Sequence, residues 1–480
     1  MPDALAQLWN RIADIPHIGL YVSIAWFAYL VLLAGWIVLQ KREPAATLSW
    51  VLSLAALPYL GFVIYFLLGP QRIRRQRMKR IRARSRLGRA EVSLARDRLD
   101  ECVKLSLLAR ASTGLEPSAA LRPTLLENGA QTFPALLDAI AAATHHIHLA
   151  YYIFEPDRTG TALRDALIER ARAGVRVRLL LDGVGSGRAS NRFLKPLKEA
   201  GGEVAWFHPF RVRLLRRPKI NLRSHRKIVV VDGRIGFTGG INITDDQDER
   251  INPAAYRDLH LRFEGEAVRG LQLTFLEDWV YAARVALRDA RLWPELPTGG
   301  VPALILPSGP DSPWESIHRL HVEALHQAEQ RAWLMTPYFV PGEAARFAIT
   351  SAALRGVDVR VLVPRRSDSR IVTAAARSYY DELFAAGVRV FEYRPGMLHS
   401  KALLVDHDIA LLGSANFDNR SFRVNFELSV LIHDTGIASA LERVWDGYMP
   451  DSVEIHADRR RAPWWRRLAE AFARLLSPLL

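Results

Sequence analysis

Cysteine is almost absent from this chain of 480 residues, in which Cys102 is the only one. A single thiol excludes an intramolecular disulfide and a cysteine-based metal site, so Cys102 receives no functional role. Acidic residues are also scarce relative to basic ones: 50 Asp and Glu stand against 65 Lys and Arg, and the net charge is +15. This excess predicts an anionic partner, and a nucleic acid or an acidic membrane surface fits it equally well.

Two stretches near the amino terminus contain no Asp, Glu, Lys or Arg. They run from Ile15 to Gln40 and from Pro44 to Pro70, with only residues 41–43 between them. At about 1.5 Å per residue, a helix of either length crosses a hydrocarbon core about 30 Å thick. The alternative is a cleaved signal peptide, whose apolar region would be shorter. The sequence therefore predicts a tight hairpin of two transmembrane helices within residues 1–70.

A basic run follows the second apolar stretch directly. Residues 72–89 contain ten Lys and Arg and no acidic residue. A solvated helix face is one interpretation, but the position beside a membrane span favours a cytoplasmic anchor to anionic head groups. We therefore expect residues 71–120 to form a basic cytoplasmic linker and the rest of the chain to lie in the cytoplasm.

The remainder alternates helical patterns with short β-rich runs, which predicts an α/β fold with helices covering a largely buried sheet. Two halves of this region match each other, as Gly174 and the four residues after it match Gly356 and its successors. We expect two pseudo-symmetric α/β/α half-domains at residues 121–300 and 301–455. The strands expected in them are Val175–Asp182, Lys227–Val231, Leu259–Phe263, Val357–Val363, Lys401–Val405 and Leu428–Ile432, and the helices are Thr161–Ala173, Glu266–Ala283, Glu343–Leu354 and Ile371–Ala386.

The last segment, residues 456–480, is amphipathic. Trp464, Trp465, Arg466 and Arg467 precede an apolar run. A helix in the membrane interface and a helix packed against the domain both fit this pattern.

One pattern of polar residues occurs once in each half. A histidine is followed by lysine two residues on, aspartate seven residues on and asparagine seventeen residues on. Alternate residues of a strand share one face, so each half is expected to present its imidazole and its ammonium together. The two sets are His225, Lys227, Asp232 and Asn242, and His399, Lys401, Asp406 and Asn416.

Such a set suits phosphodiester chemistry. One imidazole can attack phosphorus and form a phosphohistidine while the other protonates the departing alkoxide. The lysines and asparagines would hold the non-bridging oxygens, so no metal is needed. A single histidine or lysine in a strand is usually structural, but two matching copies make coincidence a poor explanation.

The duplicated motif resembles the signature of the phospholipase D superfamily. Within it, the chain resembles bacterial cardiolipin synthases of the two-span type along essentially its whole length, including Lys41–Pro44, Ser308–Pro310, Thr336–Pro341 and Ser477–Leu480. The resemblance implies a phosphatidyltransferase of the bacterial cytoplasmic (inner) membrane, with its catalytic part in the cytoplasm. It would join two phosphatidylglycerols into cardiolipin, release glycerol and need no cofactor.

The resemblance also implies roles for single residues. His225 becomes the nucleophile and His399 the acid/base. In that family a downstream carboxylate orients each histidine, and the matching positions are Asp258 and Glu427. Ser414 joins Asn242 and Asn416 as a ligand of the substrate phosphate.

Two positions carry further expectations. The motif aspartates Asp232 and Asp406 are counted with the catalytic set, but we expect them to shape the strand ends rather than to touch phosphate. Gly240 stands where the family commonly has a serine, so one hydroxyl donor to the substrate is expected to be missing.

Several alternatives stay open. A hydrolytic phospholipase D or a phosphatidyltransferase with another donor fits the same motifs. Two membrane spans argue against a nuclease, so nucleic acid is not expected as a partner, and a membrane scaffold would not need two intact motifs. Eight basic residues between Arg211 and Lys227 predict a rim that attracts anionic head groups, with a solvated loop as the alternative. The oligomeric state stays open.

Overall fold

The computed structural model describes residues 16–39, 47–48, 51–52, 54, 103–209, 222–456 and 463–477. The chain divides into two compact units, of which the first is Met1–Arg72 with Val212–Pro218 and the second is the remainder. Most of the predicted second span, the basic run at residues 72–89 and the basic stretch at 211–221 lie outside the described residues.

The first unit contains one long apolar helix, α2 (Ile18–Val38). Its segment Ile18–Gly35 has a mean hydropathy of 2.0 and contains no buried residue. Among the described residues, α2 is the one helix long and apolar enough to cross a membrane. It coincides with the first of the two predicted spans, and the two-helix hairpin itself stays a prediction.

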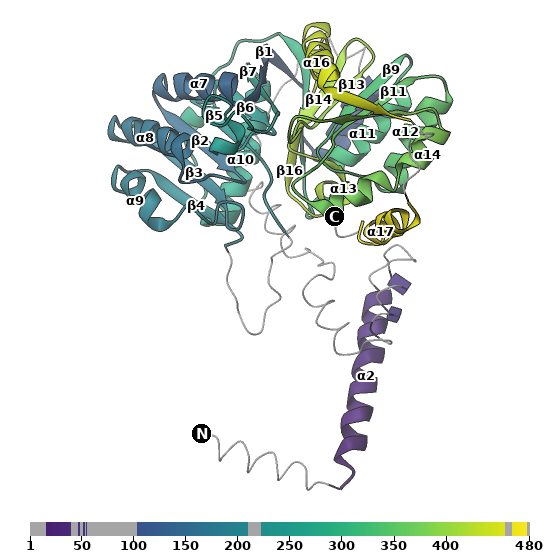
Figure 1. The fold of residues 1–480 in the computed structure, drawn as a ribbon. Helices are drawn as coiled ribbons and strands as arrows, with labels where there is room; N and C mark the ends of the chain where they lie inside the picture. The colour runs from purple at the N-terminus through teal and green to yellow at the C-terminus, as the bar shows by residue number, and fades with distance from the viewer. Residues whose placement is uncertain are drawn as a thin grey trace. The chain divides into compact units, whose positions relative to one another are not determined.

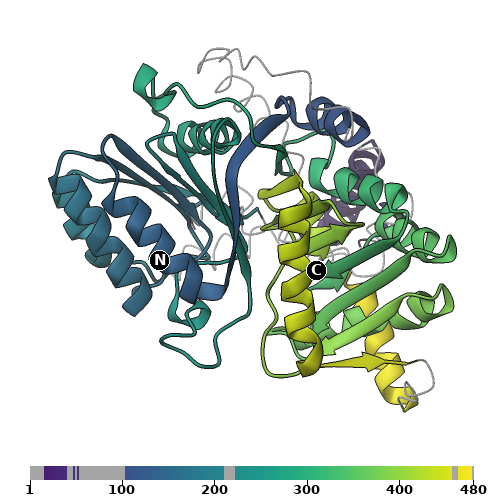
Figure 2. The same ribbon diagram turned by 90° about the horizontal axis from the view of Figure 1, so that it is seen from above.

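The second unit is built on a continuous sheet that has 15 strands in its described part (Figures 1 and 2). Their order is β17-β12-β11-β9-β13-β14-β16-β8-β1-β7-β6-β5-β2-β3-β4. The strands of the first half are β1 (Ser118–Glu127), β2 (His146–Tyr151), β3 (Arg176–Asp182), β4 (Glu203–Phe207), β5 (Ile228–Val231), β6 (Ile235–Gly239) and β7 (Leu259–Glu264). Those of the second half are β8 (Val301–Ser308), β9 (Arg331–Met335), β11 (Asp358–Pro364), β12 (Arg389–Tyr393), β13 (Ala402–Val405), β14 (Ile409–Gly413), β16 (Glu427–His433) and β17 (Ser452–Ile455), while β10 (Phe339–Val340) and β15 (Phe417–Asp418) pair separately.

Helices cover the sheet in both halves. The first half carries α7 (Asn128–Ala141), α8 (Arg158–Arg172), α9 (Asn191–Glu199) and α10 (Ala267–Ala283), preceded by α6 (Val103–Thr113). The second carries α11 (Ser316–Gln327), α12 (Glu343–Leu354), α13 (Arg370–Arg377), α14 (Tyr380–Ala385), α15 (Asn419–Arg423), α16 (Thr435–Tyr448) and α17 (Trp464–Leu475).

The halves repeat one topology. The order β1-β7-β6-β5-β2-β3-β4 returns as β8-β16-β14-β13-β9-β11-β12, with β17 added at the edge. The repeats join where β1 and β8 pair antiparallel, from Ser118 opposite Ala303 to Ala120 opposite Val301. The prediction of a duplicated α/β fold is confirmed.

Several predicted boundaries differ from those in the structure. The helix expected at Ile371–Ala386 is interrupted, and α13 and α14 replace it. The Ser378 hydroxyl donates to the Ala375 carbonyl oxygen at 2.6 Å there, a local bond that competes with helix continuation. The strands expected from Lys227 and Lys401 begin one residue later.

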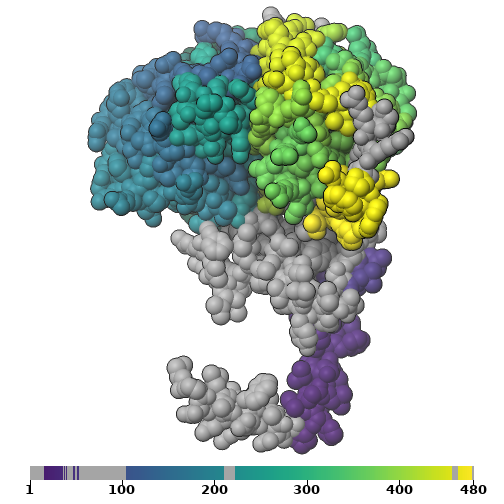
Figure 3. Space-filling view, in the orientation of Figure 1, coloured from purple at the N-terminus to yellow at the C-terminus, as the bar shows by residue number. Residues whose placement is uncertain are grey.

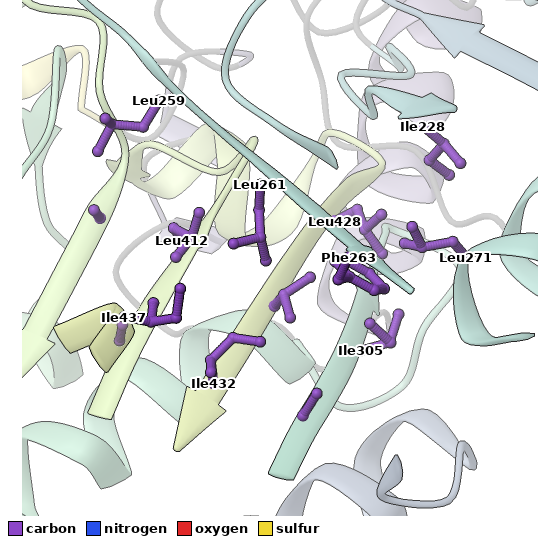
Figure 4. Packing of buried hydrophobic residues seen from close by; sticks show 14 of the residues in the cluster. Ile228, Leu259, Leu261, Phe263, Leu271, Ile305, Leu412, Leu428, Ile432 and Ile437 are labelled. Carbon is purple, nitrogen blue, oxygen red and sulfur yellow. The ribbon is translucent and has the colours of Figure 1, made fainter. Parts of the chain in front are cut away.

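One hydrophobic core is shared by the halves. It includes Leu261 and Phe263 of β7 and Leu271 of α10 together with Leu428 and Ile432 of β16, all buried (Figure 4). Separate cores lie under α7–α9 and under α11–α14. Because β7 and β16 contribute to the same core, each half stabilises the other.

We therefore expect the second unit to unfold as one cooperative body. Leu428→Ala should lower its free energy of unfolding by about 2–5 kcal/mol, because the side chain leaves a cavity in the shared core. A thermal unfolding scan should show one transition that shifts as a whole. Two separate transitions, of which only one moves, would contradict the shared core.

Candidate active site

His225 is held by backbone pairing with the opposite half. It lies in an extended segment that precedes β5, and this segment forms a parallel bridge between Ser224 and Phe426. The His225 N–H donates to the Phe426 carbonyl at 2.8 Å, and the Phe426 N–H donates to the Arg223 carbonyl at 2.8 Å. Phe426 directly precedes Glu427, so this pairing brings the Glu427 carboxylate to the histidine.

His399 is held in the same way. Leu398 forms a parallel bridge with Arg257 of the first half. The His399 N–H donates to the Arg257 carbonyl at 2.7 Å, and the Arg257 N–H donates to the Met397 carbonyl at 2.9 Å. Arg257 directly precedes Asp258, so each motif histidine meets a carboxylate from the other half.

Side chains alternate between two faces as predicted, although the motif histidines and lysines lie in extended segments just before β5 and β13 rather than in the strands. Arg226, between His225 and Lys227, is buried on the other side. Its guanidinium donates to the Glu427 carbonyl at 3.0 Å, to Asp278 Oδ2 at 2.6 Å and to the Ser308 carbonyl at 2.9 Å. Arg226 thus ties the backbone of Glu427 to α10 and β8.

The histidine–carboxylate pairs are crossed. His225 Nδ1 lies 3.2 Å from Glu427 Oε1, and His399 Nδ1 lies 2.5 Å from Asp258 Oδ2. Both expected carboxylates, Asp258 and Glu427, lie beside a motif histidine, and each comes from the half opposite to that histidine. The parallel bridges between the halves cause the exchange. With Nδ1 engaged on each ring, Nε2 is the nitrogen left for chemistry.

Glu427 is held by donors from its own half. Ser414 Oγ donates to Glu427 Oε2 at 2.5 Å and Asn425 Nδ2 donates to Glu427 Oε1 at 3.0 Å. Ser414 is fully buried, and its hydroxyl also accepts from the Leu428 N–H at 3.0 Å. The Ser414 hydroxyl therefore donates to the Glu427 carboxylate, whereas the sequence predicts that it binds a substrate phosphate.

Gly240 occupies the matching position beside Asp258. A Cβ atom at Gly240 would lie 2.1 Å from Asp258 Oδ1, so the carboxylate fills the space of a side chain. The Asp258 carboxylate instead accepts from its neighbouring Leu259 N–H at 2.8 Å. A serine hydroxyl at position 240 would therefore donate to Asp258 rather than to the substrate, and this donor is missing.

The two lysines are buried with the histidines. Lys227 Nζ donates to the His225 carbonyl at 2.9 Å, and Lys401 Nζ donates to the His399 carbonyl and lies 3.7 Å from Asp258 Oδ2. Burial, followed by repulsion from Lys401, lowers the pKa of Lys227 to about 7. Burial likewise lowers the pKa of Lys401 to about 8, despite attraction from the carboxylates. Two ammonium groups near each other in a dry site favour an anion between them.

Burial and the lysines also keep the histidines neutral. The pKa of His399 is lowered to about 4, first by burial and then by Lys401, and the pKa of His225 is lowered by burial and Lys227. Burial alone would raise the pKa of Asp258 and of Glu427, but the lysines and histidines beside them lower both. The carboxylates are therefore ionised and the imidazoles neutral at pH 7 in the substrate-free site.

The asparagines lie beside further polar residues. Asn242 Oδ1 accepts from the Ile153 N–H at 3.3 Å, and the Asn242 N–H donates to Gln247 Oε1. Gln247 Nε2 in turn lies 3.3 Å from His399 Nδ1. In the second half the Asn416 N–H donates to Ser421 Oγ at 3.2 Å.

Three residues of the site were not anticipated from the sequence: Gln247, Asn425 and Tyr152. Gln247 stands five residues after Asn242, as Ser421 does after Asn416, and this equal spacing could have indicated it. Asn425 precedes Glu427 by two residues. The Tyr152 ring lies 4.4 Å from the His225 ring, and Lys227 Nζ lies 5.6 Å from the same ring.

The motif aspartates lie away from this site. Asp232 follows the far end of β5, at a φ of 54°, and its carboxylate accepts from the N–H groups of Thr144, His145 and His146 at 2.8 Å each. Asp406 has a φ of 49° and accepts from the backbone of residues 329–331. Both carboxylates hold a turn against the start of a neighbouring strand. Asp232 and Asp406 therefore do not belong with the catalytic residues.

The histidines of β2 make packing and hydrogen-bond contacts inside the first half. His148 Nδ1 lies 3.1 Å from Gln272 Oε1, and its ring stacks on Phe275 at 4.5 Å. Among the described residues no group of three or more His, Cys, Asp and Glu side chains is arranged to hold a metal ion.

Substitutions should show that the carboxylates of the site serve activity, whereas those of the turns serve stability. Asp232→Ala removes the acceptor of several backbone donors and should lower the free energy of unfolding by about 1–3 kcal/mol while the folded enzyme stays active. Glu427→Gln should keep the unfolding temperature and lower kcat by about 10²-fold or more, because His225 loses its orienting charge. Unfolding scans and transfer rates on the same preparations measure both. An inactive but stably folded Asp232→Ala enzyme would contradict this division.

The lowered lysine pKa values predict proton uptake on anion binding. At pH 7.5 Lys227 is partly neutral, and a bound phosphodiester raises its pKa, so protons enter with the ligand. Calorimetric titration with dimethyl phosphate in two buffers of different ionisation enthalpy measures this uptake. Lys227→Met should reduce it, and equal heats in both buffers for the wild type would refute the prediction.

Comparisons with known proteins agree with these motifs and this fold. The family model described as "Cardiolipin synthase, PLD-like domain" matches residues 136–251 and 321–448, and "Phospholipase_D-nuclease N-terminal" matches residues 24–70. The chain is 40% identical to Cardiolipin synthase 2 of Bacillus anthracis over 92% of its own length and 88% of that protein. It is 39% identical to the cardiolipin synthase of Geobacillus kaustophilus over 99% of its own length and 97% of that protein.

Among solved structures, the phosphatidylserine synthase of Haemophilus influenzae Rd KW20 superposes with a TM-score of 0.61. It covers 78% of this chain and 100% of that chain at 16% identity, a likeness that concerns the fold. The matches to these relatives extend over most of the length of both proteins, and the family model matches this chain in both halves. The chain therefore belongs to the cardiolipin synthase family of phospholipase D-like proteins.

Proposed function

We propose that this enzyme is a cardiolipin synthase that transfers a phosphatidyl group between two phosphatidylglycerol molecules and releases glycerol. The observation that carries the proposal is the pair of crossed histidine–carboxylate contacts beside two buried lysines. It supports one phosphate site with a nucleophile and an acid on opposite sides. Relatives about 40% identical over most of the chain bear the same name.

In the first step His225 Nε2 attacks the phosphorus of one phosphatidylglycerol. The bond between phosphorus and the glycerol oxygen breaks, and a protonated His399 delivers its Nε2 proton to that oxygen, so glycerol leaves. The product is a phosphatidyl group on His225. Glu427 stabilises the positive charge that the attacking imidazole acquires.

In the second step the terminal hydroxyl of another phosphatidylglycerol is the nucleophile. His399 takes its proton while its oxygen bonds to phosphorus and the bond to His225 Nε2 breaks. Cardiolipin leaves, His225 is free again, and His399 carries the proton for the next cycle. One phosphodiester replaces another, so the exchange needs no nucleotide.

Lys227, Lys401, Asn242 and Asn416 bind the non-bridging oxygens in this mechanism. Their charge and amide donors are present before substrate arrives, and burial strengthens them. Asn416 Oδ1 is buried and has no hydrogen-bond partner among the described residues. This open acceptor supports a role for the Asn416 side chain toward a hydroxyl of the substrate.

The lipid substrate places the enzyme at a membrane. Helix α2 and the net charge of +15 support anchoring at an anionic bilayer. We extend this to a multi-pass anchor within residues 1–70, a basic linker at 71–120 and a catalytic part, residues 121–455, on the cytoplasmic side of a bacterial inner membrane. The donor is phosphatidylglycerol, which carries both the phosphodiester and the attacking hydroxyl.

The test uses purified protein in mixed micelles with phosphatidylglycerol labelled in its phosphatidyl group. We expect the wild type to form cardiolipin and free glycerol, and His225→Ala and His399→Ala each to lose about 10³-fold or more in rate. His326→Ala, an exposed histidine of α11, is the matched control and should keep full activity.

Rapid quenching identifies the nucleophile. Label should stay covalently on the wild type and be absent from His225→Ala. Retention on His225→Ala and loss from His399→Ala would reverse the two roles. Phosphatidic acid in place of cardiolipin would make the enzyme a hydrolase.

A further inference from the structure

Helix α17 presents an apolar face to solvent. The side chains of Trp464, Trp465, Leu468, Phe472 and Leu475 are 75%, 53%, 49%, 60% and 73% exposed. At about 100° per residue they occupy one arc of the helix, so they form a single stripe. Figure 3 shows α17 at the surface of the second unit.

The opposite face of α17 is fastened to the second half. Ala473 is buried, and the Arg474 guanidinium lies over the Tyr379 ring at 4.4 Å. The Tyr379 hydroxyl is 2.9 Å from Ser477 Oγ just beyond the helix. Because these contacts set the rotation of the helix, the exposure of the stripe is a fixed property of the fold.

The helix lies at the edge of the sheet that carries the site. Ala402, the residue after Lys401, pairs with Met335 at the carboxyl end of β9, and α13, which contacts α17, follows the carboxyl end of β11. Asn419 Nδ2 donates to the Ser477 carbonyl at 3.3 Å. Asn419 is three residues from Asn416, so the end of α17 is connected to the segment that bears a proposed phosphate ligand.

The stripe is flanked by positive charge. Arg466 and Arg467 are exposed, the Arg466 guanidinium lies over the Trp465 ring at 5.0 Å, and Glu470 is the only acidic residue of the helix. Three further arginines, residues 459–461, precede it in the sequence. Tryptophan beside arginine is typical of helices that lie at the head-group level of anionic membranes.

We propose that α17 is a docking surface for an anionic phospholipid bilayer. The stripe inserts among the head groups, Arg466 and Arg467 bind lipid phosphates, and the second half is held with its site edge toward the lipid. The inference rests on the proposed function in one respect, namely that the substrates are phospholipids. A second copy of the chain is the competing occupant, but it would have to cover exposed arginines beside the stripe.

Label depth in the whole reconstituted chain tests the docking. Cys102→Ser removes the native thiol, and Phe472→Cys then carries a spin label. In vesicles containing phosphatidylglycerol, we expect the label to be accessible to oxygen and shielded from a water-soluble nickel complex. In purely zwitterionic vesicles the shielding should be weaker.

Leu354→Cys is the matched control. Leu354 is 72% exposed and ends α12 just before β11, at the opposite edge of the sheet. Its label should stay accessible to nickel in both kinds of vesicle. A water-accessible label at position 472 in phosphatidylglycerol vesicles would overturn the proposal, as would spin–spin broadening that disappears when unlabelled protein is added.

Activity gives a second readout. The double variant Arg466→Gln, Arg467→Gln should raise the apparent KM for vesicle phosphatidylglycerol about fivefold or more and leave kcat on a short-chain, monomeric phosphatidylglycerol unchanged. Arg172→Gln, an exposed arginine of α8, should change neither. An unchanged KM in the double variant would overturn the role of the arginines. Label depth requires no turnover, so it tests the docking even if cardiolipin is not the product.

Discussion

The crossed contact between each motif histidine and the carboxylate of the other half is the interaction on which the second unit depends. His225 with Glu427 and His399 with Asp258 are each built from segments that pair across the halves. Neither half alone contains an oriented histidine. The shared core under β7 and β16 therefore also maintains the site, because separating the halves would remove both histidines from their carboxylate partners.

Charge balance explains why such a site can be buried. When both lysines are protonated, they balance the two carboxylates and the two neutral histidines add no charge, and each carboxylate has donors around it. The cost of burial falls on the lysines, whose pKa values are lowered to about 7 and about 8. A phosphodiester relieves this cost, since its negative charge stabilises both ammonium groups. In the proposed mechanism, the destabilised empty site is thus the source of affinity for the substrate phosphate.

The sequence allowed the histidines, lysines and asparagines to be predicted, because the motif occurs twice at equal spacing and the spacing is local. The duplicated α/β fold followed from the same repeat. The exchange of Asp258 and Glu427 could not be predicted, since it depends on which segments pair across the halves. The contact between the Ser414 hydroxyl and Glu427 could not be predicted either, because it depends on how the chain folds in three dimensions.

Duplication gives two similar half-sites, but the proposed reaction needs two different roles, and the surroundings of the two histidines differ. Glu427 already accepts from Ser414 and Asn425, whereas Gly240 leaves Asp258 without a hydroxyl donor and close to His399. Lys401 Nζ lies 3.7 Å from Asp258 Oδ2, so Asp258 stabilises this ammonium as well as any proton on His399. In the empty site burial and Lys401 keep its pKa at about 4, and protonation therefore has to accompany the arrival of the phosphate.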